Sequence, residues 1–257
     1  MMEFIDTHAH LYDEAFDGDF DETVARIKGN GVVRCIFPAI DSTTFERQRN
    51  AAEKCGDFAV QAIGLHPTSV AENWREELDF VLEEVERNNY VAIGEIGMDG
   101  YWSKEFISQQ KEVFAQQLKL AYRKGLPVII HAREATDDIF QVLDSLGGEV
   151  PRGVFHAFSG SWETYSRICG YGDFMVGIGG VATYKNAGVA KTLERIPLEK
   201  IVLETDSPYL TPVPFRGKRN ESSYLVYIAE KISQIKGCTL EEVASITTAN
   251  AKKMFGL

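Results

Sequence analysis

The feature that most constrains this chain is the regular alternation of short apolar runs with amphipathic segments along its whole length. Eight runs rich in aliphatic and β-branched residues recur, and they lack clean polar alternation. Near-continuous apolar strands of this kind are typical of a parallel sheet that is buried on both faces. The expected strands span residues 4–7, 32–37, 58–63, 91–94, 128–130, 153–155, 174–178 and 201–203.

The segments between the strands have helical periodicity. Leu78, Val81 and Val85 repeat at helical spacing, and Thr239 with Glu242 predicts a capping box for the last helix. Strand and helix alternate eight times in 257 residues without a linker-like stretch. This favours an α/β fold with a single (β/α)8 TIM barrel, one domain over residues 1–257. The alternative is an open doubly wound sheet.

All five histidines fall at the end of an expected strand or just past it. His8 and His10 close the first strand, His66 follows the third, His131 ends the fifth and His156 ends the sixth. In a barrel the carboxyl ends of the strands form the catalytic face. The histidines are therefore expected to gather on one face of the molecule.

Two acidic residues occupy equivalent places. Glu95 follows the expected fourth strand, and Asp206 lies just past the eighth. A carboxylate beside a buried aliphatic strand is costly unless it is paired or ligated. His8 and His10, two residues apart in a strand, point to the same face, and imidazole and carboxylate groups are the usual ligands of Zn²⁺-like metals. The pattern predicts a metal site at the strand ends, with donors enough for two ions and Glu95 able to bridge them.

Other groups are candidates for substrate contacts. Arg133 lies just past His131, and a basic cluster in the loop after the eighth strand contains Arg216, Lys218 and Arg219; these cations could bind phosphate. A solvated basic loop is an equally good interpretation of that cluster. Aromatic residues in the loops of the same face could stack on bases, although loop aromatics more often only pack. They are Tyr101, Trp102, Trp162, Tyr184 and Tyr209.

A glycine-rich stretch at residues 177–182 loosely matches a dinucleotide-binding pattern, with Glu204 about 22 residues beyond its end. In that motif a helix should begin inside the pattern, whereas residues 183–186 look like a longer loop. We therefore favour close packing of small residues at a strand end. Glu204 alternates with Asp206 and is expected to share its face, either behind the metal ligands or as a buried partner.

Charge and targeting signals limit the function further. The net charge of −11 disfavours a protein that coats nucleic acid, but bound cations and a local basic patch can still reverse the field inside one cleft. No signal-like N-terminus is visible, and no apolar run approaches the roughly 20 residues that cross a bilayer. Four widely spaced cysteines indicate reduced thiols. We expect a cytoplasmic protein with no membrane contact and no obligate protein partner.

Seven motifs, in order along the chain, resemble the TatD family of metal-dependent deoxyribonucleases, which belongs to the amidohydrolase-like barrels. They are FIDTHAHL at 4–11, GLHP at 64–67, GEIGMD at 94–99, VIIHAR at 128–133, HAFSG at 156–160, LETDSP at 203–208 and RGKRNE at 216–221. Three departures occur: Ser222 where the family usually has proline, Gly100 before Tyr101, and Ala157 for a frequent cysteine. None removes an expected ligand, but the first two alter loops at the mouth.

The resemblance implies a barrel with two divalent cations, of which Zn, Mg, Mn and Fe are not distinguished. It implies two ligand sets that share Glu95: His8, His10, Glu95 and Asp206 for one ion, and Glu95, His131 and His156 for the other. It also implies 3′–5′ exonuclease action on DNA, at single strands or 3′ ends, by a metal-bound hydroxide. Asp206 and Glu95 are the implied catalytic residues, Asp206 orienting or deprotonating the water. His66 and Arg133 are the implied phosphate contacts.

A small-molecule hydrolase on the same binuclear barrel is the alternative, acting on an amide, lactone or phosphoester. Many such barrels bridge their metals with a carboxylated lysine on the fourth strand. This chain offers Glu95 there and no lysine. The sequence therefore favours the nuclease. A non-catalytic binding protein is the least favoured reading, because every implied ligand is present.

Overall fold

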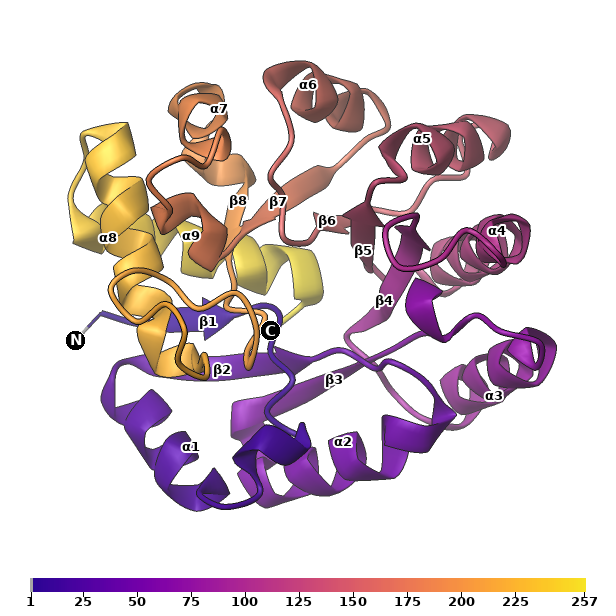
Figure 1. Ribbon diagram of the computed structural model, residues 1–257, viewed down its shortest axis with the longest axis horizontal. Helices are drawn as coiled ribbons and strands as arrows, with labels where there is room; N and C mark the ends of the chain where they lie inside the picture. Colours follow the sequence, from indigo (N-terminus) through magenta and orange to yellow (C-terminus); the bar gives the residue numbers. More distant parts are fainter. Residues whose placement is uncertain (1) are drawn as a thin grey trace.

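The computed structural model, which describes residues 2–257, is a barrel of eight parallel strands surrounded by helices (Figure 1). The strands pair in chain order, and β8 meets β1 where the Thr7 amide donates to the Leu203 carbonyl at 3.0 Å. The expected (β/α)8 barrel is therefore confirmed. The strands are β1 (Phe4–Asp6), β2 (Val32–Phe37), β3 (Ala59–Ile63), β4 (Ala92–Asp99), β5 (Val128–Arg133), β6 (Gly153–Phe155), β7 (Phe174–Ile178) and β8 (Ile201–Leu203).

The helices begin and end near the positions that the sequence signals indicate. Gly125 and Gly237 end α4 and α8 in the left-handed conformation, which glycine adopts without steric cost. The capping box before α9 is confirmed, because Thr239 and Glu242 each accept the other's backbone amide. The helices are α1 (Phe20–Gly29), α2 (Ser42–Cys55), α3 (Trp74–Arg87), α4 (Ile107–Lys124), α5 (Thr136–Ser145), α6 (Trp162–Gly170), α7 (Val189–Arg195), α8 (Leu225–Lys236) and α9 (Leu240–Phe255).

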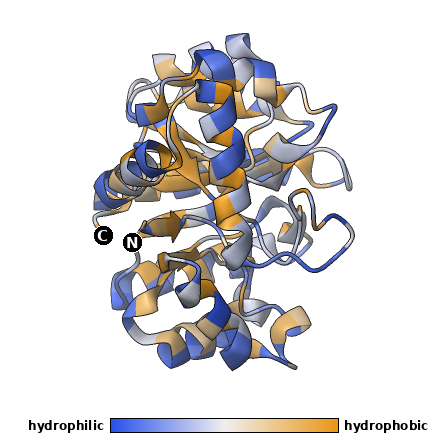
Figure 2. Ribbon diagram, turned by 90° about the vertical axis from the view of Figure 1, so that its left-hand side faces the viewer, coloured by the Kyte–Doolittle hydropathy of each residue, from blue (hydrophilic) through white to orange (hydrophobic). Residues whose placement is uncertain are grey.

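Two separate apolar clusters hold the barrel together, and the strands and the inner faces of the helices are correspondingly apolar (Figure 2). The larger cluster lies between the strands and the helices. The smaller one takes one residue from each strand: Ile5, Ile36, Ala62, Ala92, Ile129, Val154, Met175 and Val202. The end of α9 packs against this inner layer through Met254 and Phe255. One end of the barrel is thereby closed by apolar side chains, and the polar residues that follow the strands lie at the other end.

The expected fourth and fifth strands are too short, which is a correction. β4 continues to Asp99 and β5 to Arg133, and these two residues pair with each other. Glu95 and His131 consequently lie within their strands rather than at the ends. The apolar pattern stops early because the final residues of both strands turn polar groups into the pocket described below, while their backbones continue to pair.

The glycine-rich stretch serves close packing, as expected. A methyl group on Gly177 would lie 2.0 Å from the Glu204 Oε2 atom, and one on Gly180 would lie 1.9 Å from the Leu210 carbonyl oxygen. Both distances are far below van der Waals contact. These glycines therefore make room for Glu204 and for the loop after β8.

Replacing Gly177 with alanine is expected to lower the free energy of unfolding by about 1–3 kcal/mol, since the added methyl group must displace the buried Glu204 carboxylate. Urea denaturation measures this change. Gly188→Ala is the matched control, because Gly188 has no neighbour within 4 Å of the added carbon. Equal stabilities of the two variants would contradict the packing argument.

No helix in residues 2–257 is both long enough and apolar enough to span a membrane. Cys35 and Cys55 are buried, Cys169 and Cys238 are half-buried, and all four thiols are free. The location of the protein in the cell stays a prediction.

Candidate metal centre

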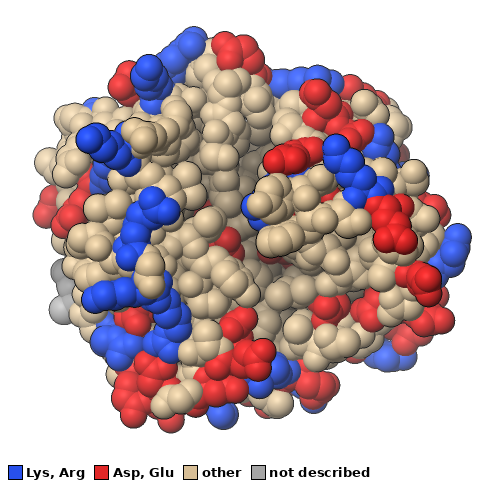
Figure 3. All heavy atoms as spheres, viewed as in Figure 1, with Lys and Arg blue, Asp and Glu red and all other residues tan. Residues whose placement is uncertain are grey.

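A cavity of about 670 Å³ opens at the end of the barrel opposite the closed one, and its lining includes His10, His66, His131 and His156. Figure 3 shows this hollow in the middle of the face, with acidic atoms at its floor. The fifth histidine, His8, is fully buried and stacks on His156, with ring centroids 3.8 Å apart. The structure therefore brings the five histidines together, although they come from four motifs that are far apart in the sequence.

Four side-chain atoms form a first cluster: His8 Nε2, His10 Nε2, Glu95 Oε2 and Asp206 Oδ1. The His8 nitrogen lies 3.1 Å from that of His10, 3.0 Å from Glu95 and 3.7 Å from Asp206. The His10 nitrogen lies 3.8 Å from Glu95 and 3.5 Å from Asp206. A tetrahedral shell with metal–ligand bonds of about 2.0–2.2 Å requires ligand separations of about 3.3–3.6 Å. These five separations bracket that range, and His8, His10 and Glu95 lie close enough together to hold one divalent cation, with Asp206 beside both histidines.

The chemistry of these four atoms also fits a cation. Both carboxylates can only accept hydrogen bonds when ionised. The Tyr12 hydroxyl donates to the Pro38 carbonyl at 2.5 Å, so His10 Nδ1 must donate to Tyr12, and His10 Nε2 faces the cluster with a lone pair. Three acceptor atoms, from His10, Glu95 and Asp206, thus surround His8, and the single ring proton of neutral His8 cannot bond to all of them. A metal ion at the centre of the cluster would bind all of these lone pairs.

A second cluster surrounds the other oxygen of the same carboxylate. Glu95 Oε1 lies 2.8 Å from His131 Nδ1, 3.2 Å from His156 Nε2 and 3.3 Å from His66 Nε2. Glu95 therefore stands between the two clusters, with one oxygen toward each. This is the position that a bridging carboxylate requires.

Carboxylates behind the histidines determine which ring nitrogen faces the clusters. His131 Nε2 lies 2.9 Å from Asp99 Oδ2, and His156 Nδ1 lies 3.1 Å from Glu204 Oε1. Each outer nitrogen donates its proton to one of these carboxylates, so the inner nitrogen, which faces Glu95, can give a lone pair to a cation that takes the place of its own proton. Carboxylate–histidine pairs of this kind orient metal-binding histidines in many proteins.

Electrostatics keep Glu95 ionised. Burial alone would raise its pKa, but the surrounding imidazole rings of His8, His156 and His66 outweigh burial and lower the pKa well below the ordinary value. For His156, burial opposes protonation, yet Glu95 and Glu204 raise its pKa well above the usual range, so a cation that binds its inner nitrogen must displace a proton. The carboxylate is therefore in the form that ligates cations.

Glu95 reaches the pocket because β4 is irregular. From Ile93 to Ile96 the strand advances three residues while β5 advances two, from Val128 to Ile130. Such a bulge reverses which side chains point inward. Ala92 belongs to the inner layer, and by simple alternation Glu95 would point outward, but after the bulge it faces the pocket.

The predicted substrate contacts separate into two groups. Arg133 and His66 line the cavity. The side chains of Arg216, Lys218 and Arg219 do not, although they lie in the loop after β8. Arg219 binds Asp19 through two nitrogens, at 2.6 and 2.7 Å.

Asp99 is a residue of the site that the sequence analysis missed. It is buried, and it holds both His131 and the turn after β4: its Oδ1 atom accepts the amides of Tyr101 and Trp102 at 2.9 and 3.2 Å. It lies four residues after Glu95 in one strand, where two side chains share a face. If the expected fourth strand had been continued to residue 99, Asp99 would have been expected on the same face as Glu95.

Substituting alanine for Asp99 is expected to weaken metal binding or catalysis about 10- to 100-fold, because His131 loses the partner that orients its ring. Metal titration and kcat/KM both report the effect. Asp144→Ala is the control, since Asp144 is a surface carboxylate bound to Arg167 and Tyr171 outside the cavity. If both variants behave alike, Asp99 does not support the site.

Comparisons with known proteins agree with this geometry. A family model described as TatD related DNase matches residues 5–256. The chain is 43% identical to the uncharacterized metal-dependent hydrolase YabD of Bacillus subtilis, over 97% of this chain and 98% of that protein. It is 30% identical to the uncharacterized metal-dependent hydrolase YcfH of Escherichia coli K12, over 99% and 96% of the two chains.

Solved structures are similar over the same length. The TatD homologue YjjV of Escherichia coli K12 superposes with a TM-score of 0.87 at 30% identity, covering 99% of this chain and 98% of that one. A TatD family hydrolase of Entamoeba histolytica superposes with a TM-score of 0.85 at 27% identity, covering 99% and 98%. The likeness therefore extends over the whole barrel.

Proposed function

The chain belongs to the TatD-related DNase family of metal-dependent hydrolases, and from that premise we propose that it hydrolyses phosphodiester bonds of DNA, removing nucleotides from 3′ ends. We assign this activity to one hydrolase domain over residues 1–257. The observation that carries the proposal is the placement of Glu95 between two donor clusters, beside the cationic Arg133 in the same cavity. Two cations that share a carboxylate ligand can stabilise the attacking and the leaving oxygen in an in-line displacement at phosphorus.

Each cluster has a set of residues able to hold a divalent cation. We assign one ion to His8, His10, Glu95 and Asp206, and a second to Glu95, His131 and His156. When bound, divalent cations activate water and neutralise the charge that develops on phosphate oxygens. Imidazole-rich sets of this kind suit Zn²⁺, Mn²⁺ or Fe²⁺, while Mg²⁺ favours oxygen ligands.

Asp206 is the group we assign to proton transfer. Burial would raise its pKa, but the adjacent His10 ring and its interactions with His156 and His8 lower it, so the carboxylate is ionised and can accept a proton. Its side chain keeps 16% exposure toward the cavity. A water attacking phosphorus in this cavity would be oriented by Asp206 and would transfer its proton to it.

His66 and Arg133 are the groups we assign to the substrate phosphate. The backbone amide of Thr68 donates to His66 Nδ1 at 3.2 Å, so the ring proton of neutral His66 is on Nε2, which faces Glu95 Oε1. His66 thus offers a hydrogen-bond donor to the cavity, unlike His131 and His156, which offer lone pairs. A donor suits a phosphate oxygen better than a metal ion.

The basic loop after β8 is assigned to the DNA backbone outside the cavity. Basic side chains gather beside the hollow, over this loop (Figure 3). Arg216 packs on Tyr184 and Lys218 packs on Phe215, whereas Arg219 is engaged by Asp19. We therefore assign backbone contacts to Arg216 and Lys218, and only a supporting role to Arg219.

The test is degradation of a 5′-labelled single-stranded oligodeoxynucleotide by chelator-treated protein resupplied with Mg²⁺, Mn²⁺ or Zn²⁺. Shortening by single nucleotides from the 3′ end is expected, and a 3′ phosphorothioate linkage should block it. DNA left intact with every metal, together with turnover of a lactone, amide or phosphotriester panel, would instead identify a small-molecule hydrolase.

A further inference from the structure

The turn after β4 places a large aromatic side chain at the mouth of the cavity without burying it. Trp102 lines the cavity, yet it is 70% exposed. The other tryptophans, Trp74 and Trp162, are buried and half-buried. A tryptophan that only packs would lose most of its exposure, because its large apolar surface gains from burial. The indole of Trp102 is therefore a free surface next to the candidate metal centre.

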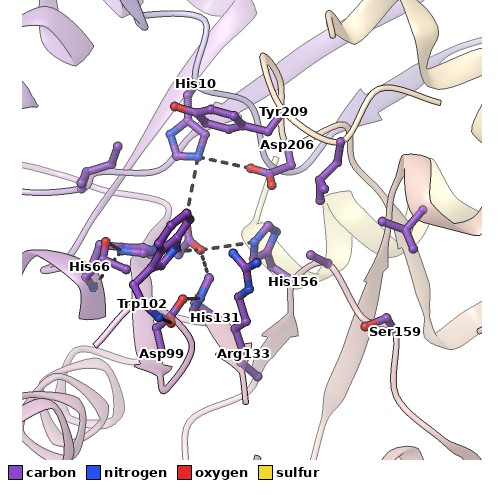
Figure 4. Close-up of a pocket in the computed structure, with 17 residues that line it drawn as sticks. His10, His66, Asp99, Trp102, His131, Arg133, His156, Ser159, Asp206 and Tyr209 are labelled. Atoms are coloured by element: carbon purple, nitrogen blue, oxygen red, sulfur yellow. Dashed lines mark hydrogen bonds and ion pairs between the residues drawn. The ribbon is translucent and has the colours of Figure 1, made fainter. Parts of the chain in front are cut away.

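This exposed ring is anchored through the same carboxylate that holds a candidate ligand. One oxygen of Asp99 accepts the amides of Tyr101 and Trp102, and the other faces His131 Nε2 at 2.9 Å. Figure 4 shows Trp102, Asp99 and His131 side by side. The backbone that carries the indole is therefore held next to the second cluster.

A free cation stands beside the ring. The Arg133 guanidinium lies 3.7 Å from the ring centre of Tyr101 and 5.4 Å from that of Trp102, and within residues 2–257 it has no carboxylate partner within 4.0 Å. An aromatic face and an unpaired guanidinium at one cavity wall match the two parts of a nucleotide, the base and the phosphate.

We propose that Trp102 is a stacking platform for the base of the 3′-terminal nucleotide, while Arg133 contacts its phosphate. This inference rests on the proposed nuclease function and specifies its substrate. A base can stack on Trp102 only after leaving its own duplex stack, so the platform selects single-stranded or frayed ends. Because any base offers a π face, the platform selects unpaired ends rather than a particular sequence.

The experiment compares two oligodeoxynucleotides that differ only at the 3′ terminus, one intact and one ending in an abasic residue. The ratio of their kcat/KM values is measured for the wild type, Trp102→Ala and Tyr122→Ala. Tyr122, on α4, is the matched control, since it is 46% exposed and lies outside the cavity lining. Because Trp102 is largely exposed, its replacement should leave the fold intact, which circular dichroism checks.

The wild type and Tyr122→Ala should prefer the intact terminus by about 5- to 150-fold, the range that corresponds to one base–aromatic stack. In Trp102→Ala the ratio should fall toward one. A Trp102→Ala enzyme that keeps the wild-type ratio would overturn the proposal even if the nuclease activity stands.

A second measurement separates the platform from the activity. Deoxyadenosine 5′-monophosphate, titrated in Mg²⁺ buffer, should quench tryptophan fluorescence in the wild type and in Tyr122→Ala but not in Trp102→Ala. If the protein cleaves no DNA, this quenching still supports a nucleotide platform while the proposed function fails. Absence of quenching in the wild type would remove the platform as well.

Discussion

Glu95→Gln is expected to lower kcat/KM on single-stranded DNA by about 10³-fold or more. Each oxygen of Glu95 faces a different donor cluster, Oε2 toward His8 and Oε1 toward His131. The carboxamide replaces one of these oxygens with an NH₂ group, which cannot ligate a cation, and it removes the negative charge. One substitution thus damages both candidate sites. Initial rates and elemental analysis of the same preparation measure the two effects.

The matched control is Glu77→Gln on α3. Glu77 is another buried glutamate, and it accepts hydrogen bonds at 2.9 Å from the amide and hydroxyl of Ser42, away from the cavity. Its replacement should leave metal content and kcat/KM near the wild-type values, whatever it costs in stability. Full activity and full metal content in Glu95→Gln would show that the shared carboxylate does not organise the site.

Removing metal with a chelator is the second prediction with a large effect: activity should fall to background and return when a divalent cation is added. The melting temperature should fall as well. At a cation concentration 100 times the dissociation constant, bound metal adds about 2.7 kcal/mol to the free energy of unfolding. For a chain of this size that corresponds to a shift in Tm of about 5–10 °C. Differential scanning calorimetry with and without the metal measures it.

Glu95→Gln serves as the internal comparison for this experiment. Its Tm should respond to chelator and to added metal less than that of the wild type, because its clusters have lost a shared ligand. A wild-type protein whose activity and Tm ignore prolonged chelation would contradict the assignment of cations to these residues.

Much of the site follows from strand periodicity alone. Inner-layer residues and pocket residues lie an even number of positions apart on four strands: Ala62 and His66, Ile129 and His131, Val154 and His156, Val202 and Asp206. Side chains two apart in a strand share a face, so an apolar core at one level continues as a polar pocket at the next. That is why His66, His131, His156 and Asp206 share one face, as expected without coordinates.

The same periodicity fails on two strands. On β4, Ala92 and Glu95 both point inward although they are three residues apart, because a bulge separates them. On β1, Ile5 lies in the inner layer and His8, two residues past the end of the strand, reaches the first cluster, again three residues on. No local pattern marks these irregularities.

The sequence alone determined the eightfold alternation, the barrel and the set of possible metal ligands at its open end. All three depend on spacing between residues that are near neighbours in the sequence. Only the tertiary structure decided that Glu95 divides its two oxygens between the clusters and that Asp99 joins His131 to the exposed Trp102. It also decided that Asp19 engages Arg219. These contacts depend on bulges and on competition among side chains from distant segments, and both are settled only when the strands have paired.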